Sequence, residues 1–171
     1  MHFNHDNRVG PELAVALVNA EPEADLEAIL RDHAIRWPRL DAQGVAVLRS
    51  WSDALRAAFE TAEPDERCAV INRLLDEAAG RLHLTTHDGL DPHLHLVADE
   101  KDVVARVKAV TAGGLAFLTA WTGGTRLGIC DRDGCRLVFV DTSRNGRRRY
   151  CSARCGNYDA VARHRASRPR T

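Results

Sequence analysis

The 171-residue sequence has very little lysine, no long apolar run and no recognisable leader. Lysine occurs only at Lys101 and Lys108, against 22 arginines. Genome composition explains such a bias as well as function does, so arginine at any one site is weak support for a role. No apolar run approaches the roughly 20 residues that span a bilayer. The first residues, MHFNHD, lack the basic-then-apolar pattern of a signal peptide. We therefore expect a cytoplasmic protein without a membrane segment.

The common catalytic motifs are also missing from the sequence. We find no glycine-rich phosphate loop, no nucleophile elbow and no persuasive pair of carboxylates. The pair Gly113-Gly114 is flanked by helix-like sequence, which favours close helix packing or a kink over phosphate binding. The sequence therefore predicts a protein that is not an enzyme.

The strongest positive feature is a set of four cysteines near the C-terminus. They form two pairs, Cys130 with Cys135 and Cys151 with Cys155, and fifteen residues separate the pairs. Two disulfides are the alternative, but cytosolic thiols stay reduced and paired cysteines there usually bind metal. Four thiolates close a tetrahedral zinc site and leave no position for substrate, which favours one structural zinc per chain. The fifth cysteine, Cys68, lies in a helical pattern and is predicted to be a small buried hydrophobe.

The sequence around the cysteines predicts a small finger. The segment between the pairs begins with an alternating apolar run and then contains Asn145-Gly146, a signal for a tight hairpin turn. Beyond Cys155 the chain has a helical pattern that ends at Pro169. The predicted order is knuckle, hairpin, knuckle and helix, as in a treble-clef zinc finger.

Charge is distributed unevenly although the formal net charge is zero. Residues 126–171 contain twelve arginines and four aspartates, a balance of +8, and the remaining residues have a balance of −8. A basic terminal module indicates a polyanion partner, most simply nucleic acid. The alternative is that the opposite charges help the two parts of the chain to dock on each other.

Before the finger, the pattern predicts a mainly helical domain with one small β-hairpin. The predicted helices cover residues 11–19, 23–35, 41–61, 64–80, and Asp99 or Asp102 to Trp121. The first has proline in its first turn. The third has Asp41 as its N-cap and an apolar stripe of Val45, Leu48, Trp51 (or Ser52), Leu55 and Phe59. Between the last two, residues 82–96 alternate with period two around Asp88-Gly89. Gly123-Gly124 is expected to form a flexible joint, so the predicted domains are 1–122 and 126–171.

Six histidines raise the question of a second metal site: His2, His5, His83, His87, His93 and His95. Three of them, His83, His93 and His95, occupy the polar positions of the predicted hairpin. Solvated or hydrogen-bonded side chains are expected at such positions, so a second metal is disfavoured.

The finger sequence resembles a known family. The residues RRRYCSARCGN and the arginine-rich helix that follows, VARHRASR, are similar to the bacterial CGNR zinc finger. The upstream helical region, with its segment LAVALVN, looks like the ABATE domain that usually precedes that finger. The resemblance implies that Cys130, Cys135, Cys151 and Cys155 bind the zinc. The sequence departs from the family pattern at Tyr158, which stands where the motif CGNR has its arginine.

The family is described as stress-induced transcription regulators, which implies a DNA-binding finger and a helical domain that senses a ligand. From the residues, we expect DNA phosphates to meet arginines around the turn and along the helix: Arg144, Arg147, Arg148, Arg149, Arg154, Arg163, Arg165 and Arg168. The expected partners are DNA and either a small-molecule ligand of the helical domain or a second copy of the chain. The alternative is a zinc-stabilised protein-interaction module that binds no nucleic acid. A separate question is the role of Tyr158 and Val161, which either join the arginines in contacting DNA or pack on the hairpin while the arginines surround that contact.

Overall fold

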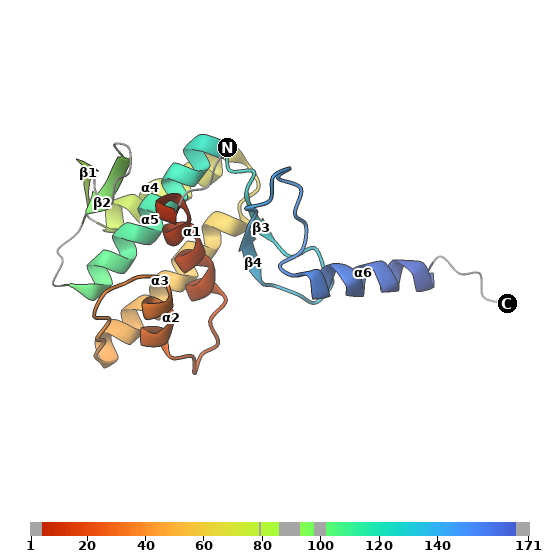
Figure 1. The fold of residues 1–171 in the computed structure, drawn as a ribbon, viewed down its shortest axis with the longest axis horizontal. Coiled ribbons are helices and arrows are strands. Elements are labelled where there is room, and N and C mark those ends of the chain that lie inside the picture. Colours follow the sequence, from red (N-terminus) through yellow and green to blue (C-terminus); the bar gives the residue numbers. More distant parts are fainter. Residues whose placement is uncertain (1–4, 79, 86–92, 98–101, 167–171) are drawn as a thin grey trace.

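The computed structural model describes residues 5–78, 80–85, 93–97 and 102–166. Within them, helices and short strands follow one another in the order α1 His5–Val18, α2 Leu26–Asp32, α3 Ala42–Glu60, α4 Pro64–Ala78, β1 Arg81–Thr85, β2 His93–Val97, α5 Val103–Thr122, β3 Leu127–Ile129, β4 Val138–Val140 and α6 Ala153–Ala166. Helices α1 to α5 form a body, β3 and β4 lie against it, and α6 projects away from it (Figure 1). The predicted fold class, mainly α with a small β-hairpin and a C-terminal finger, is confirmed.

The longest helices begin where the sequence places their caps. The Asp41 carboxylate accepts a hydrogen bond from the Gly44 amide at 2.7 Å, and the Asp102 carboxylate accepts one from Ala105 at 3.0 Å. The stripe of α3 is buried as predicted at Leu48, Trp51, Ser52, Leu55 and Phe59, but Val45 is 36% exposed. Capping and periodicity therefore determine most of the body.

Helix α1 differs from its prediction because it begins at His5, so Pro11 lies inside the helix instead of in its first turn. Pro11 is fully buried where α1 packs closely against α5. A Cβ atom added to Gly114 would lie 2.8 Å from the Cα of Gly10, so the two helix backbones nearly touch. This contact confirms that the Gly113-Gly114 pair permits close packing, and that packing outweighs the loss of one helical hydrogen bond at Pro11.

Helices α2 and α4 differ from their predictions in two details. Asp25 caps α2, which covers only Leu26–Asp32 instead of residues 23–35. In α4 the buried positions recur at helical spacing and include Arg67, Val70, Ile71 and Leu74. Cys68 falls outside that stripe and is exposed, so its prediction as a buried hydrophobe is wrong.

The hairpin of the body forms as predicted. Strands β1 and β2 are antiparallel, with Leu82 opposite Leu96 and His83 opposite His95. The predicted turn at Asp88-Gly89 lies outside the described residues, as do His2 and His87. His83 is exposed, in agreement with a polar face of the hairpin.

Helix α5 is long and apolar enough, by length and composition alone, to cross a membrane, with a mean hydropathy of 1.4 over 18 residues. Arg106 and Lys108 interrupt this stretch, so the expectation that no uninterrupted apolar run approaches the length of a bilayer span is not contradicted. The helix instead packs against α1, α4 and β2 and supplies buried Val107, Leu115 and Leu118 to the core. Its place at the centre of the body accounts for its composition.

The finger hairpin is not where the sequence places it. Strand β3 pairs with β4, so the first cysteine pair lies in the loop of the hairpin and Asn145-Gly146 lies beyond it. Gly146 has φ of +61°, but the described residues 141–150 contain no strand. The local turn signal is real, whereas the predicted second strand carries a run of arginines instead of alternating apolar residues.

The hairpin belongs to the same hydrophobic core as the body. Leu127, Val138 and Val140 are buried in the cluster formed by the helices. The Asn19 side chain at the end of α1 donates to the Val138 carbonyl and accepts from its amide, both at 2.9 Å. At the expected flexible joint, Gly123 and Gly124 have φ of +60° and +73°, and Arg67 packs against Gly124. The domain boundary at residue 122 stays a prediction. Strands β3 and β4, which form the inner half of the finger, pack against the helical body.

Candidate metal centre and nucleic-acid interface

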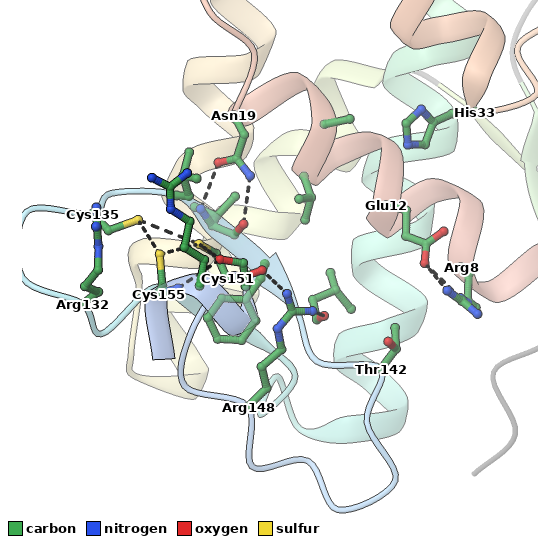
Figure 2. A pocket seen from close by; sticks show the side chains of 18 residues that line it. Arg8, Glu12, Asn19, His33, Arg132, Cys135, Thr142, Arg148, Cys151 and Cys155 are labelled. Carbon is green, nitrogen blue, oxygen red and sulfur yellow. Dashed lines mark hydrogen bonds and ion pairs between the residues drawn. The ribbon is translucent and has the colours of Figure 1, made fainter. Parts of the chain in front are cut away.

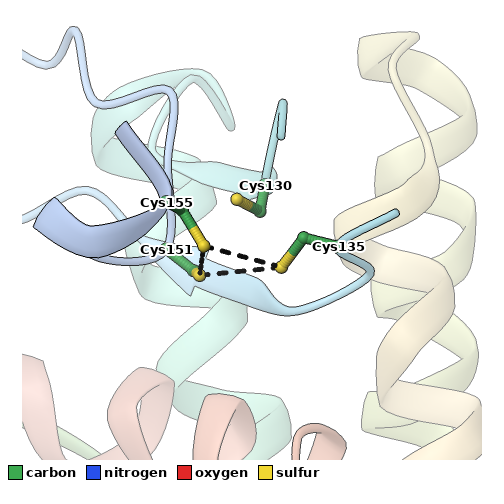
Figure 3. A group of neighbouring side chains, drawn as sticks. All are labelled: Cys130, Cys135, Cys151 and Cys155. Carbon is green, nitrogen blue, oxygen red and sulfur yellow. Dashed lines mark hydrogen bonds between the residues drawn. The ribbon is translucent and has the colours of Figure 1, made fainter. Parts of the chain in front are cut away.

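The four predicted zinc ligands come from two segments, the loop of the β3–β4 hairpin and the start of α6. Cys130 follows β3, Cys135 precedes β4, Cys151 precedes α6, and Cys155 lies in the first turn of α6. The side chains converge on one point (Figure 3). Cys130 and Cys155 are buried, while Cys135 and Cys151 are half-buried. A metal bound here joins the loop of the β-hairpin to the start of the last helix.

The sulfur atoms have the spacing of a tetrahedral zinc site. All four lie within 4.8 Å of one another. Cys135 to Cys151 is 3.8 Å, Cys151 to Cys155 is 3.5 Å and Cys155 to Cys135 is 4.0 Å. Ligands at the Zn–S distance of about 2.3 Å in a tetrahedron lie about 3.8 Å apart. None of the cysteines forms a disulfide. The donor set therefore fits one zinc ion, and the structure favours it over two disulfides.

The thiols are chemically unequal. Burial raises the pKa of Cys151 to about 12, and proton sharing with the neighbouring cysteines adds to the effect. The Ser152 hydroxyl, followed by the neighbouring thiols, lowers the pKa of Cys155 to about 7. One thiol therefore ionises near neutral pH, and binding of a cation displaces the remaining protons.

The backbone fixes the first cysteine pair. The Cys130 amide donates to the Leu137 carbonyl and the Cys135 amide to the Arg132 carbonyl, both at 2.9 Å. Between them, Gly134 has φ of +73°, a conformation that glycine adopts without strain. These contacts form a tight knuckle, as the cysteine spacing predicts.

Asp141 organises the loop of residues 141–150, and sequence analysis gave it no role. Its side chain is 2% exposed and accepts hydrogen bonds from the Ser143 and Arg148 amides, each at 2.8 Å. Burial acts to raise the pKa of Asp141, but these hydrogen bonds and the charge of Arg126 outweigh it and hold the pKa below its usual value. An aspartate directly after an apolar strand was the available signal, although a weak one.

Arg148, a predicted DNA contact, is bound within the finger. Its guanidinium donates to the carbonyls of Tyr150 at 2.8 Å, Val140 at 3.3 Å and Cys151. It also lies over the Phe139 ring at 4.9 Å. The side chain therefore connects β4 to the second cysteine pair, and its predicted DNA role stays untested.

Two more of the predicted arginines pair with carboxylates. Arg149 contacts Asp131 at 2.7 Å, and Arg163 contacts Asp159 at 2.8 Å. The Tyr150 hydroxyl also donates to Asp159, at 2.6 Å. These contacts join the loop to the first knuckle and to α6, and they reduce the charge available to a ligand.

The remaining predicted arginines are free of such contacts. Among the described residues, four are exposed and have no hydrogen-bonding or ionic partner: Arg144, Arg147, Arg154 and Arg165. Arg168 lies outside the described residues. Arg147 and the first turn of α6 border a common hollow of about 500 Å³. The structure thus divides one predicted set into bound and free arginines.

Tyr158 and Val161 are largely exposed and are not buried against the hairpin. Tyr158 is 59% exposed and Val161 is 50% exposed. The Arg132 guanidinium lies over the Tyr158 ring at 5.5 Å. The outer face of α6 therefore presents a ring and an aliphatic side chain among arginines.

A cleft of about 900 Å³ lies between α1 and the finger, beside the contact of Asn19 with Val138 (Figure 2). Arg8, Glu12 and Asn19 line it from α1, and Arg148 and Arg154 line it from the finger. Arg8 and Glu12 form an ion pair at 2.6 Å. Sequence analysis placed no body residue beside the metal centre, because nothing local in α1 indicates which element covers it.

Residues 126–168 match the family model of the CGNR zinc finger. No curated protein is similar enough to count as a relative. Together with the four convergent sulfur atoms, the match identifies a zinc-binding finger. It does not extend to residues 1–125, so the similarity of the body to an ABATE domain stays a prediction.

Proposed function

We propose that the finger binds DNA and that the chain acts as a cytoplasmic transcription regulator, with the helical body sensing a ligand or forming a dimer. In this proposal the zinc ion is structural: when bound, it cross-links the hairpin loop to α6. The protein binds its partners and catalyses no reaction.

The observation that supports DNA binding is the set of free arginines on a metal-fixed finger. Arg144 and Arg147 lie in the loop held by Asp141, and Arg154 and Arg165 lie on α6. An exposed guanidinium without a carboxylate partner is available to a phosphate, to which arginine donates two parallel hydrogen bonds. Contacts of this kind position a protein on DNA and carry no sequence information.

The test is binding of the zinc-loaded chain to two unrelated DNA duplexes at low and at physiological salt. We expect similar affinity for both duplexes and a steep decrease with salt, because each neutralised phosphate releases counterions. Absence of binding at low salt would exclude the regulator function.

One observation favours a second candidate, a protein-interaction module. Tyr158 and Val161 expose apolar surface on α6, and aromatic residues with neighbouring arginines are enriched at protein interfaces. If duplex DNA does not bind, a partner with an acidic surface becomes the leading candidate.

A further inference from the structure

A small pocket lies between α4 and α5, and none of the four zinc-binding cysteines lines it. Its volume is about 220 Å³, and apolar groups of Ile71, Leu75 and Ala116 form much of its lining. An apolar cavity of about 150 Å³ can hold a benzene molecule, so this pocket has room for one ring with a substituent.

Arg67 is the one charged residue that lines this pocket in the part of the chain that the structure describes. Its side chain is 7% exposed, yet it forms no ion pair with a carboxylate among the described residues. Nε donates to the Ala58 carbonyl at 3.2 Å and Nη2 donates to the Thr61 carbonyl, which leaves Nη1 without a hydrogen bond in that part of the chain. Burial lowers the pKa of Arg67. A buried charge is normally paired, and among the described residues no carboxylate supplies the counter-charge of Arg67.

Thr119 provides a second unsatisfied group at the same pocket. Its Oγ1 atom is buried and has no hydrogen-bond partner among the described residues. Two other threonines of α5 behave differently: Thr111 donates to the Val107 carbonyl at 2.7 Å and Thr122 to the Leu118 carbonyl at 2.6 Å. The Thr119 hydroxyl is therefore available to a ligand.

We propose that the α4–α5 pocket binds a small organic carboxylate with an apolar body. The carboxylate accepts hydrogen bonds from Arg67 and Thr119 and supplies the missing negative charge. Its apolar part contacts Ile71, Leu75 and Ala116. This ligand class follows from one uncompensated buried cation, one unpaired hydroxyl and an otherwise apolar lining.

The same residues hold the turn that leads into the finger. The Thr119 carbonyl accepts hydrogen bonds from the Gly123 and Gly124 amides. A Cβ atom added to Gly124 would lie 2.5 Å from Nη1 of Arg67, so the guanidinium packs directly on the turn. Ligand binding therefore bears on the connection between α5 and β3. This coupling rests on the proposed sensing role of the body.

The test measures binding of benzoate, cyclohexanecarboxylate and hexanoate to the full zinc-loaded chain by calorimetry, with benzyl alcohol as the neutral control. We expect at least one carboxylate to bind, and benzyl alcohol to bind about tenfold more weakly or worse, because hydrogen bonds to charged groups are the strong ones. Failure of all three carboxylates, or equal binding of benzyl alcohol, overturns the proposal.

Variants locate the site without relying on Arg67, whose replacement can unfold the body. Ala116→Leu fills the pocket and should abolish binding. Thr119→Val should weaken binding about two- to tenfold through loss of one hydrogen bond. Thr122→Val is the matched control and should change nothing, since its hydroxyl is already bonded within α5. Unchanged binding in Ala116→Leu would place the ligand elsewhere and contradict the proposal.

The DNA assay keeps the two proposals apart. Carboxylate binding without DNA binding refutes the regulator function and leaves the pocket standing. DNA binding without carboxylate binding refutes the pocket and leaves the finger standing.

Discussion

The body and the outer half of the finger are stabilised by different means. The body buries large apolar side chains such as Trp51, Leu55 and Leu115 in one core. Of the α6 side chains that the structure describes, only Cys155 is buried, and α6 is otherwise held by contacts such as Tyr150 with Asp159. Strands β3 and β4 share the core of the body. The inner half of the finger, β3 and β4, is therefore fixed by packing. Its outer half, residues 141–150 and α6, is fixed by metal and polar contacts.

Loss of the metal should have the largest effect and should divide the finger at this boundary. Purified protein should contain one zinc per chain by elemental analysis. In Cys151→Ser, we expect α6 and residues 141–150 to lose protection from hydrogen exchange while α1 to α5 keep theirs. The reason is that zinc supplies roughly 10–16 kcal/mol of apparent binding energy to isolated finger peptides.

Cys68→Ser is the matched control for this experiment, because Cys68 is exposed and outside the cluster. It should leave zinc content and exchange unchanged. If Cys151→Ser also unfolds the body, the two regions form one cooperative unit and the comparison is wrong.

Removing the contact between α1 and the hairpin should have the next largest effect. Asn19→Ala leaves both the amide and the carbonyl of buried Val138 without partners. We expect the free energy of unfolding to fall by about 2–4 kcal/mol, measured by chemical denaturation. Asn72→Ala, at an exposed position of α4, is the control and should have little effect. An equally small effect at Asn19 would show that the hairpin is not docked in solution.

Asp141→Asn tests the loop of the finger. The substitution replaces one carboxylate oxygen, which accepts a hydrogen bond from a backbone amide, by an NH2 group that cannot accept it. We therefore expect the free energy of unfolding to fall by about 1–3 kcal/mol. Because folding lowers the pKa of Asp141, its contribution is complete above the unfolded pKa and is lost as the pH falls through the folded value. In thermal unfolding experiments from neutral to acidic pH, the difference in Tm between the wild type and Asp141→Asn should become smaller. An advantage that grows toward acidic pH would contradict the structure.

The smallest expected effect is that of Tyr158→Arg, which restores the arginine of the family motif. The ring is exposed, so the change should cost no more than about 0.5–1 kcal/mol, the size of an exposed cation–π contact. If this position faces phosphate, DNA binding should tighten, as titration at fixed salt will show. Strong destabilisation would instead mean that Tyr158 packs inside the finger.

Local signals predicted much of the fold. Aspartate caps and apolar stripes placed α3 and α5 because both effects act within one or two helical turns. The spacing of the cysteines likewise predicted the metal site. The exposure of Cys68 and burial of Arg67 could not be predicted, since Arg67 enters the core only because the carbonyls of Ala58 and Thr61 receive it.

The arginine surface was predicted as a set, but its members could not be told apart from sequence. Arg148 is bound by carbonyls of its own loop, and Arg149 pairs with Asp131, which lies in the other knuckle. The hairpin was misplaced for a related reason. Asn145-Gly146 is a local signal, whereas the pairing of β3 with β4 depends on the core they share with the helices.

The salt dependence of DNA binding tests the central claim most directly, that the free arginines of the finger contact phosphates. The test compares two double variants. The finger variant combines Arg147→Ala and Arg154→Ala. The control variant combines Arg39→Ala and Arg73→Ala, which removes the same charge from exposed positions on the body. Each phosphate contact contributes about −0.9 to the log–log slope, so the finger variant should flatten the slope by about two units and weaken binding equally across sequences. The control should keep the wild-type slope. Equal slopes in the two double variants would contradict the account.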